Sequence, residues 1–334
     1  MTLLRAAPPC GGRSRPAAPT LGWSRRRMRS WSPEARKRPC TLSVRAVTRP
    51  GDTVAIASPA YYALLEVLAS LDLHVIEVST HPRHGINLDA LEAVLRGPQP
   101  IAALAMVSNY SNPTGSCMTD EAKRRLVELL ETHDVPLVED DVYGDLAFDG
   151  RRPKAIKAFD RRGLVLYCGS YSKTLSPGLR IGWAIPGRYQ NQLELLKLVV
   201  NQASATAPQL AIASFLDSGG FDRHLRRVRR MYRDQMEETI ASVDRWFPPS
   251  VRFTRPTGGH VLWVQLPPSV DAMALYEAAA ADGIRVAPGP MFSASGGYRD
   301  FIRLNTGFPW NEALERQVSV LGRLVTEMTE GEVE

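Results

Sequence analysis

The sequence predicts an α/β protein with a mostly parallel β-sheet flanked by helices, followed by a smaller C-terminal α+β domain. After residue 41, short apolar runs rich in β-branched residues alternate with longer amphipathic stretches, a pattern typical of strands joined by helices in a parallel sheet. A long helical pattern then precedes three further strand-like runs. The 334 residues, 44% of them apolar, are enough for one large and one smaller domain.

The predicted strands divide into two groups. The first group forms the large sheet and comprises residues 53–57, 74–78, 101–107, 136–139, 165–169 and 180–185. The second group forms the small sheet and comprises residues 261–266, 284–287 and 301–304. We therefore expect a large domain over residues 41–220, and a long helix with a small domain over residues 221–334.

Two helices between these strands are clearly indicated. Residues 121–133 read EAKRRLVELLETH, with Thr119 as the N-cap and Asp120 favouring the positive end of the helix. Leu126, Leu129 and Leu130 are expected to face inward. The second helix is expected from residue 221 to about residue 246.

Residues 1–40 differ from the rest of the chain. They contain six Pro and nine Arg without a period of 2 or 3.6, so we assign them no regular structure. Two hypotheses carry equal weight: the segment is an ordinary basic leader, or it is a non-native reading frame or misassigned start joined to a truncated protein.

The charge is concentrated in this first segment. The whole chain carries +6 and residues 1–40 carry +9, so the remaining residues carry −3. Nucleic-acid binding needs a clustered basic surface, and we therefore do not expect nucleic acid as a partner of the folded part. Six arginines between residues 223 and 233 form one cluster, for which a solvated helix face is the favoured interpretation.

Other classes of protein are excluded by what the sequence lacks. The apolar run at residues 101–107 is much shorter than a membrane helix requires. The four cysteines show neither C-x-x-C spacing nor a matching histidine cluster, so we expect no metal site and no disulfide framework. A reducing cytoplasm is the expected location.

Residues 169–183, GSYSKTLSPGLRIGW, bring Ser170, Ser172, Lys173 and Arg180 into one loop after an apolar strand. A lysine amine condenses with an aldehyde, and hydroxyl and guanidinium groups are donors for a phosphate dianion. Pyridoxal 5'-phosphate (PLP) carries both groups. The motif is short, and by itself a surface lysine in a serine-rich turn is the simpler explanation.

Residues 135–146, VPLVEDDVYGDL, run from an apolar strand into three acids and then Tyr143. These acids are explained equally simply as a solvated loop. A carboxylate such as Asp140 would also keep the nitrogen of a pyridine ring protonated, which PLP requires to accept electrons. The hydroxyl of Tyr143, three residues further on, would then reach the ring oxygen.

Two more segments follow predicted strands. SNYSNPTG at residues 108–115 is ordinary turn chemistry, and in a functional interpretation Asn112 directs its amide at the ring oxygen. SPAYY at residues 58–62 places Tyr61 at a strand end, where its aromatic face is suited to stacking on the pyridine ring.

Taken in this order, the four segments resemble the class I/II aminotransferase family of fold-type I PLP-dependent proteins, over roughly residues 41–330. The resemblance implies a Schiff base on Lys173, which also carries the proton. It places Asp140 on the pyridinium and Tyr61 on the ring face. The residues that it assigns to the cofactor are Tyr61, Asn112, Asp140, Tyr143, Ser170, Ser172, Lys173 and Arg180.

The same resemblance extends to the second domain. FIRLNTGF at residues 301–308 is similar to the strand that binds the substrate carboxylate in this family, which implies a bidentate contact from Arg303. A surface arginine in an ion pair is the simpler explanation of this segment. Asn112 is expected to contact substrate as well. In PTGGHVLWVQLP, residues 256–267, the adjacent glycines indicate a close backbone approach.

The chain departs from the family in one place. Members of the family carry a glycine-containing turn that opens a helix and binds phosphate, and RKRPC occupies that position here. We therefore expect this phosphate-binding helix terminus to be absent or altered. The sequence is most similar in character to 2-aminoadipate aminotransferase and to the aminotransferase-like half of MocR-type regulators, which carry a winged-helix domain upstream.

The resulting functional expectation is a cytoplasmic, homodimeric aminotransferase that moves an amino group from an amino acid to a 2-oxo acid. Two alternatives stay open. The chain is the PLP-binding effector domain of a MocR-type regulator without its winged-helix half, or it is a truncated, inactive paralogue.

Overall fold

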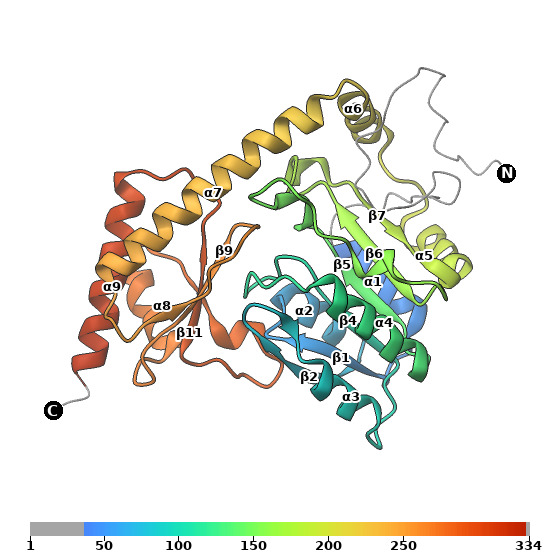
Figure 1. The fold of residues 1–334 in the computed structure, drawn as a ribbon, viewed down its shortest axis with the longest axis horizontal. Helices are drawn as coiled ribbons and strands as arrows, with labels where there is room; N and C mark the ends of the chain where they lie inside the picture. The colour runs from blue at the N-terminus through green and yellow to red at the C-terminus, as the bar shows by residue number, and fades with distance from the viewer. Residues whose placement is uncertain (1–36, 332–334) are drawn as a thin grey trace.

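The computed structural model describes residues 37–331. They form two parts, each with a sheet and helices, joined by one long helix (Figure 1). The first part contains a seven-stranded, mostly parallel sheet and the second a four-stranded antiparallel sheet. This arrangement confirms the predicted fold class.

The large sheet has the strand order β3-β2-β1-β4-β5-β6-β7. Strands β2, β1, β4, β5 and β6 pair in parallel, whereas β3 and β7 pair antiparallel at the two edges. The strands are β1 Thr53–Ser58, β2 His74–His81, β3 Gly85–Ile86, β4 Ala103–Met106, β5 Leu137–Asp140, β6 Val165–Ser170 and β7 Gly182–Ile185. The parallel strands all direct their carboxyl ends to one edge, which is where ligands bind in sheets of this kind.

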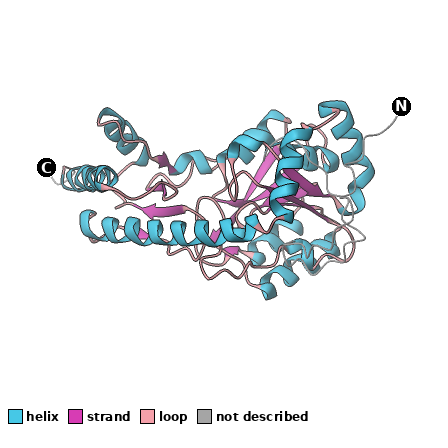
Figure 2. Ribbon diagram, turned by 90° about the horizontal axis from the view of Figure 1, so that it is seen from above, coloured by secondary structure: helices cyan, strands magenta, loops and turns pink. Residues whose placement is uncertain are grey.

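Helices cover both faces of this sheet (Figure 2). Because neighbouring strand residues point to opposite faces, Val54 and Ile56 pack with helices α1 and α2, and Ala55 packs with α3 and α4. Helix α5 lies on the same face as α1. The five helices are α1 Lys37–Val47, α2 Tyr62–Ser70, α3 Leu88–Leu95, α4 Asp120–His133 and α5 Gln190–Asn201.

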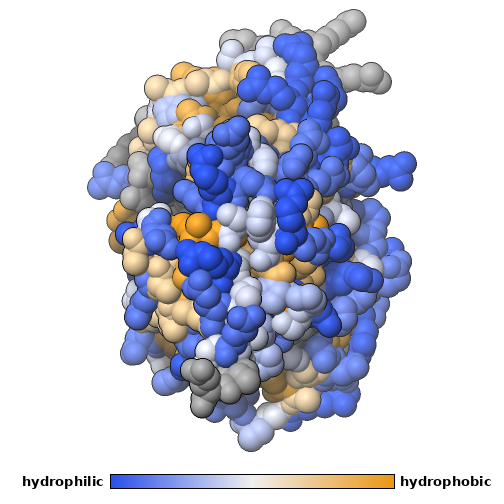
Figure 3. Space-filling model, turned by 90° about the vertical axis from the view of Figure 1, so that its left-hand side faces the viewer, coloured by the Kyte–Doolittle hydropathy of each residue, from blue (hydrophilic) through white to orange (hydrophobic). Residues whose placement is uncertain are grey.

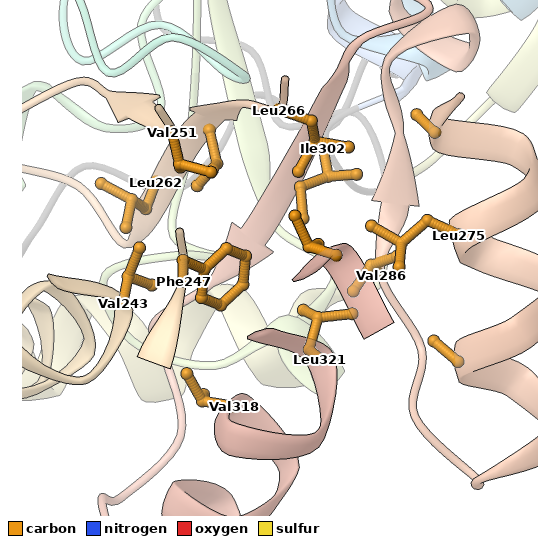
Figure 4. Packing of buried hydrophobic residues seen from close by; sticks show 14 of the residues in the cluster. Val243, Phe247, Val251, Leu262, Leu266, Leu275, Val286, Ile302, Val318 and Leu321 are labelled. Carbon is orange, nitrogen blue, oxygen red and sulfur yellow. The ribbon is translucent and has the colours of Figure 1, made fainter. Parts of the chain in front are cut away.

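The second part is built on the antiparallel strand order β10-β11-β9-β8. Val243 of α7 and Phe247, which follows this helix, pack with Leu262 of β9, Ile302 of β11 and Leu321 of α9 (Figure 4). Its outer end is mostly hydrophilic with small apolar areas (Figure 3). The elements are α6 Thr206–Asp217, α7 Gly220–Trp246, β8 Arg252–Phe253, β9 Val261–Gln265, α8 Ala272–Ala281, β10 Ala287–Pro288, β11 Phe301–Asn305 and α9 Glu312–Glu330.

Short 3-10 turns connect several of these elements. They are η2 Gly144–Leu146, η3 Ile156–Ala158, η4 Pro177–Leu179, η5 Gly187–Tyr189 and η6 Gly289–Phe292. We propose the domain boundary at residues 220 and 221, because α7 begins there after Gly219, whose φ of 67° breaks the preceding helix.

Helix α4 confirms the predicted capping. The hydroxyl of Thr119 accepts a hydrogen bond from the N–H of Ala122 at 3.2 Å, and Leu126 and Leu130 are buried. The helix ends at Asp134, which is in the left-handed conformation with φ of 51°.

Several predicted boundaries were wrong, and the strand predicted at residues 284–287 is β10 at Ala287–Pro288. Helix α1 begins at Lys37, inside the segment assigned no regular structure, because Pro39 falls in the first helical turn, where a missing N–H costs nothing. Strand β7 begins at Gly182, because Arg180 has a φ of 54° and cannot extend the strand. The rest of the predicted leader, residues 1–36, lies outside the described residues.

Candidate active site

The carboxyl ends of β1, β4, β5 and β6 lie side by side at one edge of the large sheet. Each strand carries one of the predicted residues at its end or in the segment that follows, namely Tyr61, Asn112, Asp140 and Lys173 in strand order. Neighbouring strands lie about 4.8 Å apart, so four strand ends span about 14 Å. The topology therefore brings four segments that are distant in the sequence to one site.

Tyr61, Asn112 and Asp140 line one cavity of about 40 Å³. Its other walls are mostly apolar or small side chains of β1, α2, β4 and β5, and Cys40 of α1 closes it. A carboxylate beside apolar walls favours a protonated partner, since a cation or N–H offsets the loss of water around its charge. The lining therefore offers a carboxylate and apolar contacts to a protonated ring nitrogen.

Asn112 connects the two domains of the site. Its Nδ2 donates to the hydroxyl of Tyr143 at 3.3 Å, and its Oδ1 lies 3.5 Å from Nη1 of Arg303. Asn112 and Tyr143 are almost fully buried and Arg303 is half-buried. The predicted carboxylate-binding arginine of the small domain thus reaches the predicted ring-oxygen donors of the large domain.

Glycines permit this close approach. A Cβ atom at Gly258 would lie 2.5 Å from the ring of Tyr110, and one at Gly115 would lie 2.5 Å from the side chain of Pro256. Both distances are far below van der Waals contact, so the turn at residues 108–115 packs directly on the backbone at residues 256–259. The close approach predicted for the adjacent glycines occurs at Gly258.

Lys173 is half-buried in the turn that follows β6. The carbonyl oxygen of Tyr171 accepts from the N–H groups of Leu175 and Ser176, at 2.8 and 3.1 Å, and closes this turn around Lys173. Within residues 37–331 the lysine amine makes no hydrogen bond or ion pair. The turn fixes the backbone of Lys173 while the amine stays available to a ligand.

The serine hydroxyls of this loop are paired. Ser170 Oγ lies 2.9 Å from Ser172 Oγ and accepts from the N–H of Ser172 at 3.1 Å. Arg180 is exposed, and its Nη1 donates to the carbonyl oxygen of Pro177 at 3.4 Å. The structure therefore brings Ser170 and Ser172 together, whereas the guanidinium of Arg180 bonds Pro177 and is exposed.

Helix α1 supplies a helix terminus at the same corner. A Cβ atom at Gly182 would lie 3.3 Å from the side chain of Pro39, and Gly182 pairs with Ser170 in the sheet. Further along α1, Ser43 Oγ lies 3.3 Å from Cys168 Sγ. A helix thus begins beside the two serines, and its first turn contains no glycine motif, so this helix terminus is present in an altered form.

A network of charged and polar residues next to Asp140 was not predicted from the sequence. The Asp141 carboxylate accepts from Arg152 Nη2 at 2.6 Å and from Asn109 Nδ2 at 3.1 Å. Burial alone would lower the pKa of the Arg152 guanidinium, but Asp141, Tyr167 and Asp145 reverse this and raise it. This ion pair anchors the residue that follows Asp140, and so fixes the end of β5.

Two further residues of the site were also not expected from the sequence. His260 lies between two aromatic rings, with centroids 5.5 Å from Tyr143 and 5.3 Å from Tyr232. Glu77 of β2 accepts hydrogen bonds from Ser58 of the large domain and Ser295 of the small domain. Contacts of both residues join segments that are more than 100 residues apart in the chain.

The donor set fits PLP. A carboxylate, an aromatic side chain and an amide surround the ring cavity, and two buried hydroxyls beside a helix terminus suit a phosphate. Lys173 lies in the turn after β6, the strand next to β5.

The family assignment follows from these observations and from comparison with known proteins. Residues 41–317 match the model of the family "Aminotransferase class I and II". The chain belongs to this family.

Similar proteins include both regulators and enzymes. The HTH-type transcriptional regulator YjiR of Escherichia coli K12 is 39% identical over 285 residues, which cover 85% of this chain and 60% of the regulator. The kynurenine aminotransferase of Pyrococcus horikoshii, in complex with PMP, superposes with a TM-score of 0.86 at 27% identity, covering 92% of this chain and 77% of that chain.

A third similar protein is the α-aminoadipate aminotransferase LysN of Thermus thermophilus, complexed with N-(5'-phosphopyridoxyl)-L-leucine. It superposes with a TM-score of 0.83 at 29% identity, covering 89% of this chain and 76% of that chain. The present chain spans about three fifths of the length of the regulator that it matches. The predicted resemblance to both kinds of protein is confirmed.

Residues 37–331 contain neither a membrane-spanning helix nor a cluster of metal-binding side chains. None of the helices there is both long and apolar enough to span a membrane. That part of the chain also contains no group of three or more His, Cys, Asp or Glu side chains arranged to hold a metal ion.

Proposed function

We propose that the protein is a PLP-dependent aminotransferase that moves an amino group from an amino acid to a 2-oxo acid, with Lys173 as the residue that holds the cofactor. The observation that carries this proposal is the single cavity lined by Tyr61, Asn112 and Asp140, with the Lys173 turn on the adjacent strand. Two similar solved structures hold a PMP or phosphopyridoxyl ligand.

The residues have separate tasks in this proposal. Bound PLP supplies an electron-accepting ring, and Asp140 keeps its nitrogen protonated while Tyr61 covers one face. Asn112 and Tyr143 donate to the ring oxygen, and Ser170 with Ser172 holds the phosphate, to which Arg180 contributes after a change of rotamer.

The substrate is held at the opposite side of the ring. Arg303 binds the α-carboxylate in a bidentate manner, and Asn112, whose Oδ1 lies 3.5 Å from the guanidinium, orients it. Lys173 would hold the cofactor through its amine, and when that amine is not bonded to the cofactor it would accept the α-proton of the amino acid as a base and donate a proton as an acid.

Three further properties belong to the same proposal. We infer amino acids and 2-oxo acids as substrates, a cytoplasmic location and a homodimer. Exposed apolar side chains on α5 support self-association, since Leu195 is 62% and Val199 is 73% exposed.

Absorption spectroscopy with added PLP tests the proposal. The purified chain should show a visible band of lysine-bound cofactor that shifts when an amino-acid mixture is added, and 2-oxo acid should accumulate. Lys173→Ala should abolish the band, because the amine that forms the bond is gone. Lys197→Ala, which changes another lysine on the same domain, should leave the band unchanged.

A second function is favoured by the similarity to the transcriptional regulator. In that case the chain binds PLP and senses an amine with little turnover. The cofactor band would shift with amino acid, but no 2-oxo acid would form. Absence of any band in the wild-type chain would contradict both functions and favour the truncated, inactive paralogue.

A further inference from the structure

Glu77 lies on β2, outside the set of residues that contact the proposed cofactor, and it collects hydrogen bonds from two distant segments. Ser58 Oγ donates to Glu77 Oε1 at 2.6 Å from the end of β1. Ser293 Oγ and Ser295 Oγ donate to Oε2 at 3.0 and 2.6 Å. The N–H groups of Ala294 and Ser295 complete the set at 3.2 and 3.1 Å.

These contacts make Glu77 an acceptor for hydroxyl and amide groups. Among residues 37–331, Glu77 forms no ion pair, and the five hydrogen-bond donors stabilise its charge. Burial would raise the pKa of this carboxyl, but the donors from Ser295, Ser58 and Ser293 outweigh burial and lower it. The ionised form is therefore the one that the surrounding segments require.

The segment that Glu77 holds carries part of the substrate site. The carbonyl oxygen of Phe292 accepts from the N–H of Ala60 at 2.8 Å, and the hydroxyl of Tyr298 lies 3.3 Å from Ser58 Oγ. The guanidinium of Arg303 lies over the ring of Phe292, 5.5 Å from its centroid. Phe292 is fully buried, so its ring has little freedom to move independently of the segment.

The segment therefore lies between two predicted ligand-binding residues. On one side it touches Ala60, which precedes Tyr61 in the chain, and on the other it supports Arg303. A shift of residues 292–298 relative to β1 would change the distance from the cofactor ring to the carboxylate-binding guanidinium. Productive geometry in such sites tolerates displacements of only about 0.5 Å.

We propose that Glu77 is a positioning residue that locks residues 292–298 of the small domain onto the turn after β1 and thereby sets the place of Arg303 relative to Tyr61. This inference rests on the proposed function for its effect on substrate, although the lock itself exists independently of catalysis. Glu77 acts through these segments and governs amino-acid affinity, whereas cofactor binding depends on other residues.

Glu77→Gln tests the proposal with the full chain and PLP. A glutamine amide has the same size but one acceptor oxygen, so it cannot satisfy five donors. The concentration of amino acid that half-saturates the spectral shift, and the KM, should rise about tenfold, which corresponds to one or two lost hydrogen bonds to a charged group. The kcat and the affinity for PLP should change by less than about threefold, because no residue on the cofactor moves.

Hydrogen exchange supplies a readout that does not depend on turnover. Amides of residues 289–301 should exchange faster in Glu77→Gln than in wild type, while those of β5 and β6 should be unaffected. Glu77→Asp should recover part of the substrate affinity, since it keeps the charge. Ser295→Ala removes one donor and should change both readouts in the same direction by a smaller amount. Glu92→Gln, a surface change on α3, is the matched control.

The outcomes distinguish the proposed role of Glu77 in holding residues 292–298 from the proposed aminotransferase function. Unchanged exchange at residues 289–301 in Glu77→Gln would overturn the lock. Faster exchange with unchanged amino-acid affinity would overturn the positioning role. If the wild-type chain binds no PLP, the proposed function fails, and the exchange measurement still decides the lock.

Discussion

Glu139 and Asp140 are neighbours in β5, but their environments differ because consecutive strand residues point to opposite faces. Asp140 lines the cavity, whereas Glu139 is fully buried on the other side of the sheet. Ser108 Oγ and the N–H groups of Ile156 and Lys157 donate to its carboxylate at 2.5, 2.7 and 2.9 Å. Burial and the nearby Asp141 nevertheless raise the pKa of Glu139 to about 7.

A raised pKa makes stability depend on pH in a definite direction. The folded state binds the proton of Glu139 more tightly than the unfolded state does, so its contribution is complete below about pH 4.5 and is lost as the pH rises through about 7. The melting temperature of wild type relative to Glu139→Gln should therefore fall between pH 5 and pH 8. Thermal unfolding at four pH values measures this difference, with the exposed Glu128→Gln as control, and a constant difference would contradict it.

Single residues differed in how far the sequence revealed them. Tyr61 and Asn112 follow strands and Asp140 ends one, the family resemblance assigned all three to one ring, and the structure places them around one cavity. Glu77 has partners more than 200 residues away in the chain, and no periodicity encodes such a contact. Arg180 has a left-handed backbone, which no residue-type preference indicates.

At the scale of elements, α1 shows why the first turn of a helix is difficult to predict. Pro39 and its basic neighbours suggested irregular chain, but a helix accepts proline in its first turn. The apolar positions of α1 then pack on the sheet, with Leu42 and Val44 buried. Burial of this face decides the conformation, and local composition does not.

Helices α7 and α9 approach so closely that one glycine is required between them. A Cβ atom at Gly322 would lie 2.4 Å from the carbonyl oxygen of Trp246, and backbone atoms cannot rotate away. Gly322→Ala gains up to about 1 kcal/mol of helix propensity, but overpacking costs about 1–3 kcal/mol.

We therefore expect Gly322→Ala to lower the free energy of unfolding by about 1–2 kcal/mol. Denaturant titration followed by circular dichroism measures this change. Ser319→Ala, a change on the same helix whose hydroxyl bonds only its own helix backbone, should leave the unfolding midpoint nearly unaltered. Equal midpoints for the two variants would show that the helices separate without cost.

At the scale of the whole molecule, the sequence predicted two sheets and a long helix between them. The structure contains the two sheets and the helix. It could not predict how the domains meet, because the contacts are made by irregular segments. An isolated bridge joins Ala147 to Gly258, and the N–H of Phe148 donates to the carbonyl oxygen of Thr257 at 3.0 Å. Such pairings follow from the packed shape of both domains.

The proposed homodimer leads to a prediction about helix α5. Leu195 and Val199 are four residues apart and therefore share one face of the helix, where both are exposed. Replacing both with Asp should weaken self-association at least tenfold, because two charges would be buried in an apolar contact. Sedimentation velocity measures the association, and Met273→Asp, a partly exposed site on α8, serves as control. An unchanged dimer would place the contact elsewhere.

Helix α7 contacts the turn that carries Lys173 in the large domain and packs in the core of the small domain. His224 Nε2 lies 2.9 Å from the carbonyl oxygen of Thr174, the residue after Lys173, and Arg229 Nε donates to the carbonyl oxygen of Asp145 at 2.6 Å. The far end of the helix is embedded in the small-domain core through Val243 and Phe247.

A helix of 27 residues is about 40 Å long, so a tilt of about 5° at the Lys173 turn moves its far end by about 3.5 Å. A small displacement of the turn that carries Lys173, if transmitted by the rigid helix, would therefore move the domain that carries Arg303 by a larger distance.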